Sequence, residues 1–123
     1  TMTEAKFISE IIRRTGCILL LDINNLYINS VNHKFCAIEY LNNLPLDHVQ
    51  QIHLAGHSKY KNYLLDTHDQ QISQNVWSLY KEYIIMTKKK AAITIERDDN
   101  FTELSSLITE LHYAKKIAQE IYV

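Results

Sequence analysis

The sequence predicts an α/β fold in which three parallel strands alternate with helices. Residues 17–23 form a short, continuous apolar run of the kind expected of a buried strand, and residues 49–54 and 91–96 are predicted to be the second and third strands. Segments with apolar residues at helical spacing lie before, between and after these predicted strands. Elements that alternate in this order form parallel βα units with right-handed crossovers.

The first helix and the first strand are separated by a glycine. Thr1 and Glu4 have the spacing of a capping box, so we expect a helix to begin there. Its apolar stripe starts at Phe7 and should end near Gly16. The run over residues 17–23 then predicts a strand that is covered on both faces.

The middle of the chain contains the second predicted strand and the longest connection. Residues 24–34 are rich in asparagine, and we expect a loop there with one helical turn at most. A helix over residues 37–43 should end before Pro45, because the residue before a proline avoids helical geometry. The strand over residues 49–54 is followed by residues 55–72, a long connection of the kind that often carries function.

The last third of the chain predicts a helix, a strand and a long terminal helix. Residues 76–84 have an aromatic apolar face, which we interpret as core packing rather than base stacking. The strand over residues 91–96 follows the basic run Lys88–Lys90, interpreted as a solvated loop. Asn100 and Glu103 have the spacing of an N-terminal cap for an amphipathic helix that continues to Ile121.

Composition indicates one small globular unit. The chain has 123 residues, of which 46% are hydrophobic, and its formal net charge is −1. The 13 basic and 14 acidic residues nearly cancel, so bulk charge does not favour nucleic acid or a membrane surface. No apolar run approaches the roughly 20 residues that span a bilayer. Without a secretory signal, and with only Cys17 and Cys36, we expect a cytoplasmic protein without disulfides.

Acidic and imidazole side chains follow the predicted strands. Asp22, His53 and Glu96 lie at or near three strand ends, where α/β proteins bind their ligands. Asp66 and His68 lie in the long connection, and their side chains point to the same side if the backbone is extended. Mixed carboxylate and imidazole ligands suit iron, manganese or zinc. The sequence therefore predicts a metal site.

Each of these residues also has an ordinary structural interpretation. A buried histidine such as His53 is more often a hydrogen-bonded core residue than a ligand. Asp66 can equally cap a turn. The set as a whole, drawn from three strands and a loop, is much harder to explain by structure alone.

Five segments in order resemble the multinuclear non-heme iron-dependent oxidases, formerly the domain-of-unknown-function family 692, whose members are barrels of the xylose-isomerase-like type. The resemblance implies that residues 1–123 form a single partial domain, the C-terminal part of a TIM (β/α)8 barrel with about three βα units and a terminal helix. Three strands cannot close such a barrel alone. The segments are Arg14–Tyr27, Ile52–His57, Leu65–His68, Val76–Tyr80 and Ile95–Asp98.

The same resemblance assigns roles to individual residues. It implies two or three iron ions in the complete barrel, with zinc or manganese as alternatives. Asn25 is a further ligand or a donor to one. His57 and Arg97 are expected to contact the ligands or the substrate, and a role at the surface is the alternative for both. Asp98 is expected to cap the terminal turn. The implied ligands are Asp22, His53, Asp66, His68 and Glu96.

The implied activity is that of the whole family. Its members use O₂ to oxidise cysteine residues of a precursor peptide that a partner protein presents. We expect the fragment alone to be inactive, and its unpaired sheet edges to favour a homo-oligomer. Two alternatives are an endonuclease IV-like metal-dependent hydrolase, against which the near-neutral charge counts, and a non-catalytic remnant that serves as a structural or partner-binding unit.

Overall fold

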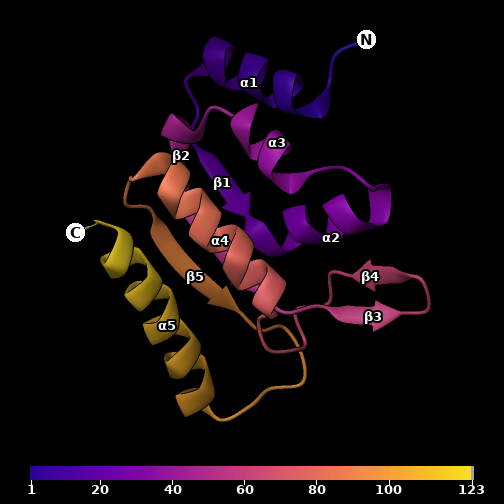
Figure 1. Ribbon diagram of the computed structural model, residues 1–123, viewed down its shortest axis with the longest axis vertical. Coiled ribbons are helices and arrows are strands. Elements are labelled where there is room, and N and C mark those ends of the chain that lie inside the picture. Colours follow the sequence, from indigo (N-terminus) through magenta and orange to yellow (C-terminus); the bar gives the residue numbers. More distant parts are fainter. Residues whose placement is uncertain (123) are drawn as a thin grey trace.

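The computed structural model describes residues 1–122 and is an α/β structure with one three-stranded parallel sheet (Figure 1). A separate two-stranded hairpin extends from the end of this sheet. The elements are α1 (Glu4–Thr15), β1 (Leu19–Asp22), α2 (Ile23–His33), α3 (Ala37–Asn42), a 3₁₀ turn (Leu46–His48), β2 (Val49–Ala55), β3 (Ser58–Tyr60), β4 (Tyr63–Leu65), α4 (Gln74–Thr87), β5 (Ala92–Glu96) and α5 (Leu104–Tyr122).

The three predicted parallel strands are confirmed, and consecutive strands are neighbours in the order β1-β2-β5. Their register aligns Asp22 with His53, and Ala55 with Glu96. Since all three strands run the same way, their carboxyl ends meet at one edge of the sheet. The register therefore brings the predicted strand-end residues side by side.

Helices cover one face of the sheet. Ile52 and Leu54 of β2 are fully buried beneath α2, and they share one core with Leu21 of β1 and with residues of α4. Leu20, which points to the opposite face, is 46% exposed. Helices that follow consecutive strands and pack together on one face are typical of a segment of a βα barrel, whereas doubly wound sheets have helices on both faces.

The expected loop over residues 24–34 is wrong, because α2 occupies Ile23–His33. Asp22 caps this helix, its Oδ1 accepting a hydrogen bond from the amide of Asn25 at 2.8 Å. Ile23, Leu26 and Ile28 are buried at helical spacing, so tertiary packing outweighs the low helix propensity of the asparagines. The first strand consequently ends one residue earlier than predicted.

Two predicted helix starts are also wrong. Thr3, rather than Thr1, caps α1, and its hydroxyl accepts from the amide of Lys6 at 3.4 Å. Asn100 does not cap the terminal helix, which begins at Leu104, since its side chain donates to the carbonyl of Asp69 at 3.2 Å. Both errors concern element boundaries, where several nearby polar residues can serve as caps.

The long connection over residues 55–72 contains structure that the sequence did not predict. β3 and β4 form an antiparallel hairpin with a two-residue turn, Lys61–Asn62. Lys61 has a φ of 50°, the left-handed conformation that such tight turns require. The predicted helix with the core residues Trp77, Tyr80 and Tyr83 and the predicted strand that ends at Glu96 are confirmed.

Both cysteines, Cys17 and Cys36, are free and exposed, as expected. Within residues 1–122, every helix is either too short or too polar to cross a bilayer.

Candidate metal site

Glu96, the last residue of β5, lies between two imidazoles. Its Oε1 is 2.8 Å from Nδ1 of His53, and its Oε2 is 3.3 Å from Nδ1 of His68. On the other side of His53, Gln51 Nε2 lies 3.1 Å from the ring Nε2. An amide nitrogen can only donate, so the ring Nε2 of His53 accepts in this contact, and it would exchange Gln51 for the ion if His53 binds a metal. Glu96 thus connects the middle strand to the loop after the hairpin.

Asp66 and His68 meet although the backbone between them is not extended as expected. His68 has a φ of 51°, a left-handed conformation that is uncommon for a residue with a side chain. Its Nε2 lies 2.9 Å from Asp66 Oδ1. Yet this buried nitrogen has no hydrogen-bond partner among the described residues, because the carboxylate lies off the direction of an N–H bond.

Three ligand atoms, one each from Asp22, His68 and Glu96, lie within 4.8 Å of one another. Together with Asp66 and His53, they place three carboxylates and two imidazoles at the carboxyl edge of the sheet. The unpartnered His68 Nε2 is suited to donate a lone pair to a cation, and the nearby carboxylates would balance its charge. The residues present therefore fit a divalent or trivalent metal ion.

The electrostatics of the site show crowding of negative charge. Burial raises the pKa of Asp22, and the charges of Asp66 and Glu96 act in the same direction. Burial opposes protonation of His68, but the surrounding carboxylates, Asp66 foremost, outweigh it and raise the pKa of this imidazole. A bound cation would relieve the repulsion that these shifts report.

Asn24 is a site residue that sequence reasoning missed. Its side chain is completely buried, and Nδ2 donates to Asp66 Oδ1 at 2.6 Å and to the carbonyl of Gly56 at 3.3 Å. Its Oδ1 lies 2.8 Å from Nδ1 of His57. Because this oxygen can only accept, His57 is protonated on Nδ1. The available signal was a pair of asparagines that begins two residues after the strand-end acid Asp22, but the assumption of a loop concealed the role of Asn24.

Asn25 also contacts the cluster. Its Nδ2 donates to Asp66 Oδ2 at 2.9 Å, and its Oδ1 accepts from Asn29 at 2.8 Å. Of the two roles considered for Asn25, this geometry favours a donor to a ligand. Asp66 is therefore held by amides from two successive residues of α2.

His57 and Arg97 were both expected to lie beside the ligands, but only His57 does. His57 is close, since it contacts Asn24 and stacks at 5.4 Å on Tyr27, and burial lowers its pKa. Arg97 is buried beneath the loop, where it donates to the carbonyl of Asp69 at 3.3 Å and faces Glu110 at 3.8 Å. Arg97 therefore joins the loop to α5 in this structure.

The expectation that Asp98 caps the terminal turn is wrong. Its Oδ2 lies 3.1 Å from Nδ1 of His68, and its amide donates to the carbonyl of His68 at 2.9 Å. Asp98 thus fixes both the ring and the backbone of this histidine.

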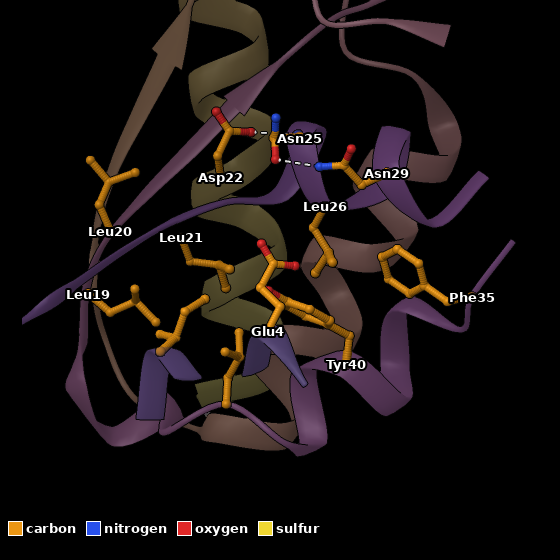
Figure 2. A pocket seen from close by; sticks show the side chains of 12 residues that line it. Glu4, Leu19, Leu20, Leu21, Asp22, Asn25, Leu26, Asn29, Phe35 and Tyr40 are labelled. Carbon is orange, nitrogen blue, oxygen red and sulfur yellow. Dashed lines mark hydrogen bonds between the residues drawn. The ribbon is translucent and has the colours of Figure 1, made fainter. Parts of the chain in front are cut away.

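A cavity of about 220 Å³ lies along β1 (Figure 2). Asp22 and Asn25 lie at one end of it, the leucines of β1 form one side, and Glu4 and Tyr40 lie opposite. Burial and the charge of Glu4 raise the pKa of Tyr40 to about 12. The cavity gives access to the Asp22 end of the cluster from the outer side of β1.

Comparison with known proteins identifies the family. The sequence profile of the family described as RiPP precursor modification enzyme MbnB/TglH/ChrH matches residues 1–119. The chain belongs to this family. UPF0276 proteins of Rhizorhabdus wittichii and Caulobacter vibrioides are each 48% identical to it, over 117 and 114 residues. These matches cover 95% and 93% of this chain but 42% and 40% of the relatives, so the chain spans about two fifths of their length.

In this member of the MbnB/TglH/ChrH family, Asn24→Ala should lower the free energy of unfolding by about 2–3 kcal/mol. The substitution leaves a partly buried carboxylate oxygen of Asp66 and the N–H of His57 without the partner that the side chain of Asn24 supplies. Urea denaturation measures the change. Asn42→Ala, at the exposed end of α3, is the matched control and should change stability by less than about 0.5 kcal/mol. Equal stabilities for the two variants would contradict the role of Asn24.

Proposed function

We propose that Asp22, His53, Asp66, His68 and Glu96 bind iron. The convergence of ligand atoms from Asp22, His68 and Glu96 within 4.8 Å supports this most strongly. Iron suits a set of carboxylates and imidazoles that contains no thiolate, and zinc or manganese are the alternatives. Two or three ions would bind when the other strands of the barrel add their ligands.

We further propose that the complete protein oxidises cysteine residues of a precursor peptide. The support is membership of a family described by its modification of RiPP precursors. Bound iron would supply the activation of O₂ and the redox chemistry of the reaction. A partner protein would present the peptide, and the reaction would take place in the cytoplasm, where Cys17 and Cys36 stay reduced.

The residues of this chain would prepare the site for that chemistry. Asn24 and Asn25 hold the two oxygens of Asp66, so the carboxylate cannot rotate freely. Such fixed neighbours keep ligands in place before a metal arrives, which lowers the entropic cost of binding.

The outer edges of β1 and β5 support the proposal of a larger barrel. Within residues 1–122, each of these strands pairs on one side only. Additional βα units would pair with both edges and cover the exposed face that carries Leu20. Without those units, we expect the chain to be inactive and to associate with itself through the same edges.

The test is anaerobic loading with Fe²⁺, Mn²⁺ or Zn²⁺, followed by desalting and elemental analysis. We expect iron to be retained and Glu96→Gln to reduce its retention at least tenfold, because a neutral amide cannot balance the charge of the ion. Glu82→Gln, exposed on α4, is the matched control and should retain iron fully. In the complete barrel, O₂ uptake should accompany a mass change in a cysteine-containing peptide.

Other outcomes would support other functions. Retention of zinc with cleavage of abasic DNA would indicate a hydrolase. No retention of any metal would indicate a non-catalytic unit and overturn the proposal.

A further inference from the structure

The hairpin of β3 and β4 lies directly beside the candidate metal site. β3 begins immediately after His57, whose ring connects through Asn24 to Asp66. Ser58, the first residue of β3, donates to Asp69 at 2.8 Å. Figure 1 shows α2 next to β4, with β3 on the side of the hairpin that faces away from this helix.

The outer edge of β4 is closed by a side chain. The amide of Leu64 donates to Oδ1 of Asn32 at 2.9 Å, and Nδ2 of Asn32 donates to the carbonyl of Leu64 at 2.9 Å. The side-chain amide of Asn32 thus occupies the position that a peptide group of a neighbouring strand would take. These two bonds also show that the N–H and C=O of Leu64 point away from β3.

The outer edge of β3 carries the equivalent pair of groups. Lys59 is directly opposite Leu64 in the register, and in such a pair both residues direct their N–H and C=O outward. Within residues 1–122, no side chain or backbone group outside the hairpin bonds to the N–H or C=O of Lys59. An edge with an unpaired donor and acceptor is a place where an extended chain adds as a strand.

The two faces of the hairpin differ in chemistry. Lys59 lines a cavity of about 520 Å³ together with Lys61, His57 and Tyr27. Neither lysine has an acidic partner among the described residues. On the opposite face, Tyr60 and Tyr63 stack edge to face at 5.6 Å beside the exposed Leu65. Tyr63 also reaches the cavity, and Nζ of Lys61 lies 5.2 Å from the centre of the Tyr60 ring.

We propose that an extended segment of the peptide substrate binds as a third strand along β3. This inference rests on the proposed action on a precursor peptide. The N–H and C=O of Lys59 bond to one residue of the segment, and that residue carries a carboxylate because its side chain lies on the lysine face. The residues on either side of it lie opposite Ser58 and Tyr60, and the one opposite Tyr60 is apolar and contacts this ring. The amino-terminal end of β3 directs the bound segment toward Asp66 and the metal ligands.

The test uses an acetylated octapeptide of alternating threonine and valine, with a glutamate in place of one central threonine and a cysteine at one end. Binding to the full chain is measured by isothermal titration calorimetry. Lys59→Pro removes the outward N–H, which an edge strand tolerates, and should weaken binding about tenfold. Lys59→Gln keeps the N–H and should weaken binding of the glutamate peptide about threefold, while leaving its glutamine analogue unchanged.

Peptides methylated on single backbone nitrogens provide a test on the unmodified protein. Methylation should weaken binding at every second position only, since alternate amides of a strand point to opposite sides. The amide resonance of Leu64, which depends on Asn32, shows whether the hairpin is intact in Lys59→Pro.

Each outcome decides between the proposals. Binding that is insensitive to Lys59→Pro and to methylation at every position would overturn docking along β3 and leave the proposed oxidation standing. Absence of binding to the wild-type chain would also overturn docking, and the metal and oxygen measurements test the proposed function separately.

Discussion

Gly56→Ala is expected to lower the free energy of unfolding by at least about 3 kcal/mol and to abolish metal retention. A Cβ at this position would overlap the carbonyl group of Gln70 and lie 2.6 Å from the carbonyl oxygen of Gln71. These are backbone atoms, which cannot rotate aside as a flexible side chain would. The segment that follows His68 would have to move away from the end of β2.

The segment that Gly56→Ala would displace positions Asp66 and His68, which are two of the proposed ligands. Asp69 accepts hydrogen bonds from the hydroxyls of Ser58 and Thr67, and these bonds hold the stretch between Asp66 and Gln70 against the hairpin. A shift of about 1 Å is enough to spoil the geometry of a site that several segments build. Stability and metal retention should therefore fall together.

Gly16→Ala is the matched control for this experiment. Gly16 has a φ of 70° and no atom within 4 Å of the position of an added Cβ. Its substitution costs only the strain of the left-handed conformation, about 1 kcal/mol, and should leave metal retention intact. Urea denaturation and elemental analysis measure both effects. A Gly56→Ala protein as stable as Gly16→Ala would contradict the close packing described for this glycine.

The parts of the fold that sequence reasoning predicted are those with a simple local pattern. The run around Leu21 is a continuous apolar stretch with an acid at its end, as expected of a buried strand of a parallel sheet, and the stretches around Ile52 and Ile93 are short segments that contain β-branched residues. The ends of parallel strands meet by geometry alone. For this reason Asp22, His53 and Glu96 could be placed together without knowledge of any side-chain contact.

The predictions that were wrong concern residues whose conformation depends on contacts with residues distant in sequence. Asn24 favours a loop by its propensity, yet it lies in a helix because its amide satisfies Asp66 and His57, which are 42 and 33 residues away. Arg97 follows a ligand directly, but β5 alternates its side chains, so it turns toward Glu110. Neither partner could be identified from the sequence near these residues.

Asp22→Asn is expected to have opposite effects on stability with and without metal. In the metal-free protein, burial and the charges of Asp66 and Glu96 raise the pKa of the Asp22 carboxyl, so its ionised form costs stability in the folded state. Asparagine removes that charge and still caps α2, because it is as good an N-cap as aspartate. At pH 7 the variant should be more stable by about 1 kcal/mol.

The sign of the pH dependence follows from the raised pKa. The folded state holds this proton more tightly than the unfolded state, whose value is near 3.8. Wild-type stability relative to the variant therefore falls as the pH rises from below 3.8 through the raised pKa. Thermal unfolding at a series of pH values should show the two proteins converging in acid and diverging toward neutrality.

Bound metal should make the wild type more stable than Asp22→Asn. An ion that binds only the folded state at a hundred times its dissociation constant adds about 2.7 kcal/mol, and the variant lacks one of the charges that hold it. Added iron should therefore raise the melting temperature of the wild type above that of Asp22→Asn. Asp22→Ala, which also loses the cap, should be about 1 kcal/mol less stable than Asp22→Asn under both conditions. An equal metal-induced rise in wild type and Asp22→Asn would remove Asp22 from the proposed ligand set, because the loss of a charged ligand must weaken the binding of the ion.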